Sequence, residues 1–336
     1  MRSTLTAIGL CLAAILPAAA AEVNVYSARH YDTDLALHEA FTRETGITVN
    51  LIEGSGDELL ARLQAEGARS PADVFITVDG GRLHRLVEAD LLAPVESATL
   101  TERVPAAYRH PDGLWFGLTT RARVLFYDKA RGAPEWLDDY EDLADPRLKG
   151  EVCIRSSSNI YNVSLMAEFI EVLGEEAATE WAKGLAANLA RAPQGGDRDQ
   201  IRAVAAGECL VGVSNTYYWG ALMASDNPED RAAAEAVGII FPNQSNRGTH
   251  VNLSGAGVVK TAPNPENAVR FIEFLTSDAA QVVLADSNNE YPVVATVKPT
   301  GPIAAYADFR PSGVNAEIFG INAARATAIY DRAGMP

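Results

Sequence analysis

The fold of this chain is constrained most by short stretches with strand character that alternate with helical stretches. In the first part of the chain, the strands are expected at residues 23–27, 47–52 and 73–78, and the helices at residues 34–44, 58–66 and 82–88. Strands that alternate with helices in this way pair in parallel and are covered by the helices. The sequence therefore predicts an α/β fold for this part of the chain.

A second alternating unit follows a long extended stretch at residues 114–127. Its strands are expected at residues 151–155 and 209–214, and its helices at residues 162–173, 175–189 and 198–206. The chain then becomes extended again at residues 237–242 and 251–260, continues into a helix at residues 265–275 and ends with a helix at residues 316–332. Two long extended stretches, one in each direction, predict two lobes joined by two crossing strands.

The boundaries of the lobes follow from these crossings. We expect residues 22–120 and 250–300 to form the N-lobe, and residues 121–249 and 301–336 to form the C-lobe. Each lobe would contain a doubly wound sheet, and ligands of such folds bind beyond the carboxyl ends of the strands. A ligand site is therefore expected in the cleft between the lobes, with hinged closure around it.

The first residues have the features of a secretory signal peptide. Arg2 precedes an apolar run at residues 5–16, which is followed by Pro17 and four alanines. The run is too short to span a bilayer, and the bulky Leu10 before Cys11 argues against a lipid anchor. We expect residues 1–21 to be removed and the exported protein to begin near Glu22.

The exported chain would keep two cysteines and a strongly acidic charge. Cys153 and Cys209 lie near the starts of the first and third strands of the C-lobe, which are neighbours in a doubly wound sheet. A disulfide is expected in an oxidising compartment, and two buried thiols are the alternative. The net charge of −16 argues against nucleic acid or anionic lipid as partners, although a solvated acidic surface explains it equally well.

Three strand ends carry side chains that could meet in the cleft. Asn215 and Thr216 favour a turn, and only a turn after the strand lets Tyr217 and Tyr218 face one ligand. The side chains expected at the mouth of the cleft are His30, Tyr31, Tyr161, Tyr217 and Tyr218. Each alone is more typical of a packing or surface residue, but together they offer phenol oxygens and an imidazole to one ion.

Phenolate is a ligand suited to a hard trivalent cation. A bound trivalent ion can displace the phenol proton, whose ordinary pKa is about 10. Four phenolates and a neutral imidazole around Fe³⁺ give a site charge of −1, which Arg29, Arg121 or Arg123 could offset. The spacing of zinc ligands and the acidic calcium loop are both missing from the sequence. An aromatic cleft for an organic ligand is the alternative interpretation.

The chain resembles the periplasmic ferric-iron-binding proteins of bacterial iron ABC transporters, also called bacterial transferrins, over essentially its whole exported length. The residues that carry the resemblance are Val25-Tyr26-Ser27-Ala28-Arg29-His30-Tyr31, Ser70-Pro71-Ala72-Asp73-Val74-Phe75, Gly117, Arg121-Ala122-Arg123-Val124, Asn215-Thr216-Tyr217-Tyr218-Trp219, Glu290-Tyr291-Pro292 and Ala333-Gly334-Met335. The resemblance implies a type II periplasmic binding protein fold, a periplasmic location, a monomer without enzymatic activity, and delivery of Fe³⁺ to an ABC permease with its ATPase.

The resemblance also assigns individual residues. Tyr217 and Tyr218 are similar to the family's paired tyrosine ligands, and His30 to its N-lobe histidine. One subgroup uses a Glu at the position of Val78 together with an exogenous anion, so that version does not fit this chain. Tyr31 and Tyr161 resemble the subgroup in which tyrosines complete the ligand set. A carbonate near Ser157 and Ser158 is compatible with the resemblance but not required by it.

Two other classes of protein are alternatives to this interpretation. A binding protein for an organic solute or an oxyanion would share the leader, the lobes and the hinge. A secreted hydrolase is the more distant alternative, since the sequence contains no Gly-x-Ser-x-Gly elbow and no zinc-protease helix. The run Ser156-Ser157-Ser158 is more simply explained as a helix cap or an anion contact.

Overall fold

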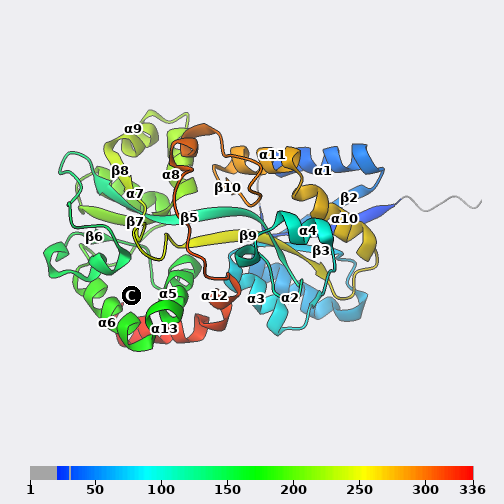
Figure 1. The fold of residues 1–336 in the computed structure, drawn as a ribbon, viewed down its shortest axis with the longest axis horizontal. Coiled ribbons are helices and arrows are strands. Elements are labelled where there is room, and N and C mark those ends of the chain that lie inside the picture. The colour runs from blue at the N-terminus through cyan, green and yellow to red at the C-terminus, as the bar shows by residue number, and fades with distance from the viewer. Residues whose placement is uncertain (1–20, 30–31, 336) are drawn as a thin grey trace, which may run out of the picture.

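The computed structural model describes residues 21–29 and 32–335, and its elements are labelled in Figure 1. The predicted leader, apart from its last residue, lies outside these ranges. The predicted ligands His30 and Tyr31 also lie outside them. Within the described ranges, no helix has the length and apolar character needed to cross a bilayer.

The N-lobe contains a parallel three-stranded core flanked by helices. Its elements are β1 (Glu22–Ser27), α1 (Asp32–Thr45), β2 (Thr48–Glu53), α2 (Gly56–Glu66), β3 (Val74–Val78), α3 (Gly80–Glu88), β4 (Leu92–Ala93), α4 (Ala98–Arg103), α10 (Pro265–Leu275) and α11 (Asp278–Asn288). β1 pairs in parallel with β2 on one side and with β3 on the other. Ser55 caps α2 and forms a capping box with Glu58.

Two long strands connect the lobes. They are β5 (Phe116–Asp128) and β9 (Val251–Val259), which pair antiparallel and cross the centre of the molecule in Figure 1. β9 pairs with β3 of the N-lobe, and β5 pairs with β7 of the C-lobe. The two predicted sheets are thus parts of one hydrogen-bonded path with the order β2-β1-β3-β9-β5-β7-β6.

The C-lobe is built around a second, smaller group of strands. Its elements are β6 (Val152–Cys153), α5 (Ile160–Leu173), α6 (Glu175–Ala187), α7 (Asp197–Ala205), β7 (Val211–Asn215), α8 (Thr216–Met223), α9 (Pro228–Ala236), β8 (Val237–Ile240), α12 (Glu317–Ile321) and α13 (Ala323–Arg332). β6 and β7 pair in parallel, as the predicted neighbouring strands should. The lobe has its own core, in which the rings of Phe169 and Trp181 pack edge to face.

Two predicted elements differ from the structure. The strand expected at residues 151–155 ends at Cys153, because the side-chain amide of Asn162 donates to the carbonyl oxygens of Arg155 and Ser156 in place of a strand partner. The single helix expected at residues 316–332 is two helices, and Asn322 between them donates to the carbonyl oxygen of Ala167 in α5.

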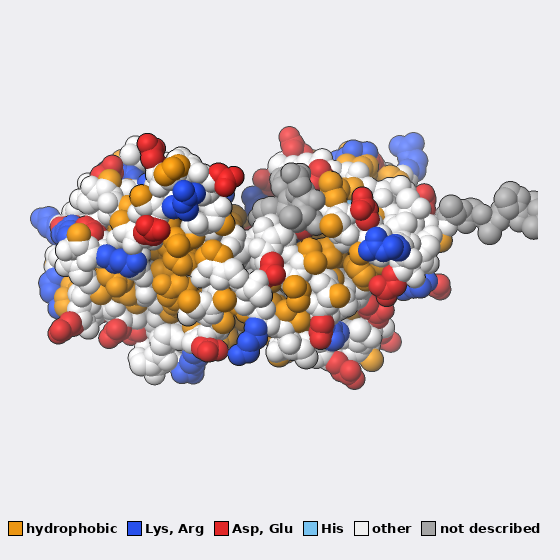
Figure 2. Space-filling view, turned by 90° about the horizontal axis from the view of Figure 1, so that it is seen from above, with side chains coloured by type: hydrophobic (Ala, Val, Ile, Leu, Met, Phe, Trp, Pro, Cys, Tyr) orange, Lys and Arg blue, Asp and Glu red, His pale blue; other side chains and the backbone are white. Residues whose placement is uncertain are grey.

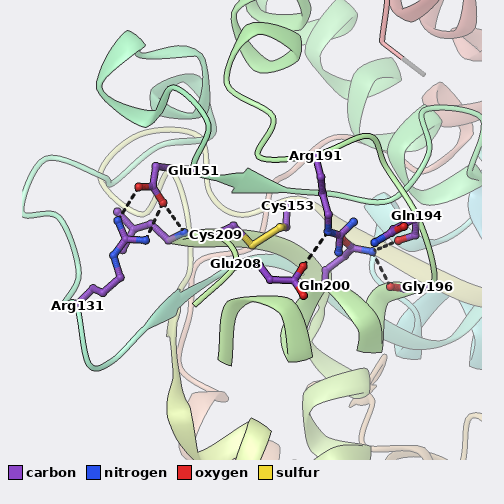
Figure 3. Close-up of a disulfide and its surroundings, with 10 residues drawn as sticks. Arg131, Glu151, Cys153, Arg191, Gln194, Gly196, Gln200, Glu208 and Cys209 are labelled. Carbon is purple, nitrogen blue, oxygen red and sulfur yellow. Dashed lines mark hydrogen bonds and ion pairs between the residues drawn. A yellow bond between two sulfur atoms is a disulfide. The ribbon is translucent and has the colours of Figure 1, made fainter. Parts of the chain in front are cut away.

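The predicted disulfide is present. Cys153 at the end of β6 is bonded to Cys209 just before β7, across a sequence separation of 56 residues (Figure 3). Both cysteines are buried. Arg131 and Glu151 form a bidentate ion pair beside it, with both nitrogen–oxygen distances at 2.7 Å. The disulfide therefore links the end of β6 to the segment before β7, and the chain beyond each strand leads toward the predicted site.

The surface of the two lobes is mixed in charge. Figure 2 shows acidic and basic side chains interspersed over both lobes. On the face seen there, the excess of acidic residues is spread over the surface rather than gathered in one patch, which fits a solvated acidic surface.

Candidate metal-binding site

The paired tyrosines lie at the turn that the sequence predicts. β7 ends at Asn215, and α8 begins at Thr216, so that Tyr217 and Tyr218 occupy the first turn of a helix. The backbone N–H of Asn215 donates to Asp197 at 3.2 Å, which fixes the end of the strand. The two phenol rings lie 4.1 Å apart, centroid to centroid, with an angle of 32° between their planes. Both rings therefore face the same side of the C-lobe.

Tyr161 approaches this pair from a different element. It lies in the first turn of α5, where the side chain of Asn159 caps the helix by accepting from the backbone N–H of Tyr161 at 3.0 Å. The hydroxyl oxygens of Tyr161 and Tyr217 are 3.2 Å apart, although 56 residues separate them in the sequence. The structure thus brings together the three tyrosines that the sequence predicts on the C-lobe side.

These tyrosines form one wall of a cavity of about 460 Å³ that lies between the lobes. The C-lobe wall consists of Tyr161, Arg198, Tyr217, Tyr218 and Ala221. The facing wall comes from the ends of β1 and β3 (Ala28, Arg29 and Val78), from Arg121 on β5 and from residues 287–290. The carboxyl ends of the strands in both lobes therefore border one cavity, as expected for this fold.

Each of the three phenol rings has a guanidinium group near its face. The arginine Cζ atom lies 5.7 Å from the ring centroid for Arg121 and Tyr217, 5.7 Å for Arg155 and Tyr161, and 5.9 Å for Arg198 and Tyr218. A cation at this distance is attracted by the ring and would be attracted more strongly by a phenolate. The guanidinium groups would therefore stabilise negative charge on the phenol oxygens of the C-lobe wall.

The phenol of Tyr218 is protonated in the absence of an ion. Burial raises the pKa of Tyr218 above its ordinary value, and the neighbouring Tyr161 and Asp197 add to this shift. A cation that binds Tyr218 as a phenolate must displace this proton. Proton release on metal binding follows directly from this arrangement.

The facing wall contains a compensated charge network. Glu290 is fully buried and accepts from Thr119 at 2.7 Å, from Arg121 at 3.0 Å and from Arg29 at 3.1 Å. Arg29 also donates to Asp34 at 3.1 Å. Burial favours the neutral form of Glu290, but the two arginines outweigh it and hold the pKa of this carboxyl below its ordinary value. The positive charges of Arg29 and Arg121 are thus largely balanced within the wall.

Three of the predicted anion or charge-balancing residues do not line the cavity. Arg123 is buried in the C-lobe, where its guanidinium donates to Asp197 and Asn215, both at 3.0 Å. Ser157 donates to the carbonyl oxygen of Met335, and Ser158 is an exposed residue whose hydroxyl lies 2.8 Å from that of Ser156. None of the three is among the residues that border the cavity.

Sequence reasoning missed two cations of the site, Arg155 and Arg198. Arg155 forms an ion pair with the buried Asp197, which also binds Arg123, and this pair holds its guanidinium near Tyr161. The signal for Arg155 was its position at the end of the predicted strand, directly before the serine run. The signal for Arg198 was weaker, because only its position at the start of a helix near the strand ends indicated a place in the site.

The ligand types also limit the metals that fit. Within residues 21–29 and 32–335, no group of three or more His, Cys, Asp and Glu side chains is arranged to hold a metal ion. The donors that converge in the described part of the cavity are phenol oxygens. Such a set suits a hard cation of high charge and does not suit a structural zinc ion.

Comparisons with known proteins identify a matching family and similar chains. Residues 36–311 match the family model for a bacterial extracellular solute-binding protein. The chain is 53% identical to iron uptake protein A1 of Synechocystis over 93% of this chain and 87% of that protein. It is 31% identical to the major ferric iron-binding protein of Neisseria meningitidis over 96% of this chain and 97% of that protein.

Solved structures of similar chains have the same fold. A Trichodesmium protein in complex with iron and citrate ligands superposes with a TM-score of 0.92 at 51% identity, over 94% of this chain and all of that chain. The open conformation of ferric iron-binding protein A from Mannheimia haemolytica superposes with a TM-score of 0.88 at 42% identity, over 94% of this chain and 99% of that chain.

Proposed function

Since the chain belongs to the bacterial extracellular solute-binding proteins, and among them to the periplasmic ferric-iron-binding proteins of iron uptake, we propose that it binds Fe³⁺ through tyrosine phenolates in the cleft. We assign Tyr161, Tyr217 and Tyr218 as the ligands from the C-lobe. The family consists of solute-binding proteins, so the hydrolase alternative is set aside. The protein delivers its cargo and does not transform it.

The observation that supports this ligand set best is the 3.2 Å separation of the hydroxyl oxygens of Tyr161 and Tyr217. Oxygen ligands lie about 2.0–2.2 Å from small cations. Two oxygens 3.2 Å apart would then subtend an angle of about 100° at one ion, close to the angles of octahedral and tetrahedral sites. The two phenols can therefore share an ion without a rearrangement of their helices.

We assign His30 and Tyr31 as the ligands from the N-lobe. Both follow directly after Arg29, which is described and lines the cavity. A fourth phenolate and an imidazole would complete the ligand set around Fe³⁺ and give the site a charge of −1. Closure of the lobes would bring these ligands to an ion already held by the C-lobe, and the exclusion of water would strengthen the attraction.

The charge of the loaded site is offset by the guanidinium groups near the phenol rings. Arg198 belongs to the C-lobe wall and Arg155 lies behind it in the same lobe, so both remain beside Tyr218 and Tyr161 whatever the position of the other lobe. Because these cations are built into the site, we propose that Fe³⁺ binds without a required anion. Carbonate or another anion can still occupy a coordination position left open by the protein.

Delivery requires partners at the membrane. As a solute-binding protein, the chain works with the permease and ATPase of an ABC transporter. We propose that it does so as a monomer whose N-lobe comprises residues 22–120 and 250–300, and whose C-lobe comprises residues 121–249 and 301–336. The crossing strands β5 and β9 would form the hinge between them.

The ligand set can be tested by chelator competition. Replacement of both Tyr217 and Tyr218 by Phe should abolish tight Fe³⁺ binding, and Tyr161→Phe should weaken it, because each change removes a phenolate donor. Tyr127→Phe is the matched control, since Tyr127 lies on β5 and does not line the cavity. Parent-like Fe³⁺ affinity in the double variant would refute the assignment. Retained binding of an organic solute by that variant would instead favour an organic cargo.

A further inference from the structure

A buried carboxylate joins the two lobes at the floor of the cleft. Asp79 follows β3 directly and is completely buried. It accepts from the backbone N–H of Gly81 at 2.8 Å, from the hydroxyl of Ser164 at 2.9 and 3.0 Å, and from the side-chain amide of Asn252 at 2.8 Å. These donors belong to α3 of the N-lobe, α5 of the C-lobe and the crossing strand β9. One side chain therefore binds all three parts of the hinge region.

The backbone beside Asp79 approaches the C-lobe closely. A Cβ atom on Gly80 would lie 2.6 Å from the carbonyl oxygen of Ala316, the residue before α12. A Cβ atom on Gly81 would lie 3.1 Å from Asp79 and 3.6 Å from Ile160 in α5. The first turn of α3 can approach the other lobe this closely because both residues are glycines. The lobes are thus in close contact beside the carboxylate.

The backbone at Asp79 adds a second indication. Its φ angle is +80°, in a region that favours glycine, yet the residue is an aspartate. Its N–H donates to the carbonyl oxygen of Leu253, and the next N–H, of Gly80, donates to the side chain of Asn252 at 3.0 Å. A non-glycine residue persists in such a conformation only where its surroundings hold it. A glycine would adopt this φ angle more readily, but it could not form the hydrogen bonds of the Asp79 carboxylate.

The contact is coupled to the proposed iron site through α5. Tyr161, Ser164 and Glu168 are spaced by three and four residues, so they lie along one face of that helix. Tyr161 points to the cavity, Ser164 donates to Asp79, and Glu168 pairs with His250, the residue directly before β9. Val78, which precedes Asp79, also lines the cavity. The orientation of the helix that carries Tyr161 is therefore set at the floor of the cleft.

We propose that Asp79 is the fulcrum of lobe closure: its carboxylate holds α5 against the N-lobe in both the open and the closed protein, so that the lobes turn about this contact. A fixed fulcrum restricts the lobes to one path of motion and keeps the ligands of both walls aligned. Without it the lobes would sample many arrangements, and the fraction competent to enclose an ion would fall. The apparent affinity falls in proportion to that fraction.

The measurement of iron release rests on the proposed function. The measurement of lobe motion in the iron-free protein does not. Spin labels at Arg43 and Glu176, exposed residues of α1 and α6, would report the distance between the lobes. The native cysteines form a disulfide and would not take up the label. The parent should give a narrow distance distribution in the apo state and a different narrow one with Fe³⁺.

Two variants remove the contact in different ways. Asp79→Gly deletes the carboxylate and suits the local φ angle, and Ser164→Ala deletes the donor on α5. Both should broaden the apo distance distribution and accelerate Fe³⁺ release to a chelator by about tenfold or more, as the competent fraction falls. The phenolate absorption band should keep its wavelength, because the ligands are intact. Thr276→Val, which removes a buried hydroxyl bond within the N-lobe, should change neither the distances nor the release.

Parent-like distance distributions and release rates in both variants would refute the proposal that Asp79 is the fulcrum. A mere loss of stability, with unchanged apo distances, would overturn it as well. If the parent itself showed no phenolate band with iron, the ligand assignment would fail. The widths of the apo distributions would then still decide whether Asp79 guides the lobes.

Discussion

Replacement of Glu290 by Gln is the change that should disturb the cavity wall most. The carboxylate is 1% exposed and faces two guanidinium groups, those of Arg29 and Arg121, which are each 1% exposed. Gln has nearly the same shape, but it has no charge and presents an amide NH₂ to donors. The variant would leave buried positive charge without its main partner.

The magnitude follows from the burial of this network. Breaking a buried ion pair by removing one partner costs about 3–5 kcal/mol. Asp34 remains beside Arg29, so one of the two cations keeps a carboxylate and the lower part of this range is expected. We therefore predict that Glu290→Gln lowers the free energy of unfolding by about 3 kcal/mol at pH 7. The wall also becomes more positive beside the ring of Tyr217, which should favour its phenolate, so the affinity for Fe³⁺ should not fall.

Urea unfolding of the iron-free protein measures the first effect, provided that the m-value is unchanged. Since the folded-state pKa of Glu290 is held below its ordinary value, its contribution is present above the unfolded pKa of about 4.3 and is lost as the pH falls through the folded value. The variant should therefore lose less stability than the parent on acidification. A loss at pH 7 of less than about 1 kcal/mol, the size of an exposed pair, would refute the reasoning.

Three further predictions concern other parts of the molecule. Replacing both disulfide cysteines by serine should lower the free energy of unfolding by about 4 kcal/mol, the chain-entropy value for a closed loop of 56 residues, and an unchanged urea midpoint would contradict this. The pKa of His84 is raised by its hydrogen bond to Glu317, so its stabilisation should be full below the unfolded pKa of about 6.5 and disappear as the pH rises through the folded value. His84→Gln should abolish that part of the pH dependence in urea titrations; an identical pH profile would exclude the contact as its cause. Arg198→Gln should weaken Fe³⁺ binding about two- to fivefold through loss of the cation near Tyr218, whereas Arg202→Gln on the same helix should leave chelator competition unchanged.

Local signals in the sequence were sufficient for the elements that carry the site. Asn215 and Thr216 after an apolar run predicted the turn that brings Tyr217 and Tyr218 to one side, and the structure confirms it. The two crossing strands and the pairing of the cysteine-bearing strands were also predicted correctly. Each of these features depends on residues that are close in sequence or on the topology of alternating strands and helices.

Contacts between distant segments were beyond such reasoning. Arg121 and Arg123 lie two apart on one strand, which predicts the same face for both. β5, however, pairs with β9 through Ala122 and with β7 from Arg123 onward, so the first arginine reaches the cavity and the second enters the C-lobe to bind Asp197. The guanidinium groups near the phenol rings and the carboxylate of Asp79 depend in the same way on chain segments that only the folded protein brings together.

The central claim is that phenolates from separated parts of the chain hold one ferric ion, and its most direct test is the visible spectrum of apo-protein titrated with Fe³⁺. We predict a phenolate-to-iron charge-transfer band that saturates at one equivalent of iron and weakens as acid returns protons to the phenols. A protein that takes up one equivalent of Fe³⁺ and remains colourless would contradict it.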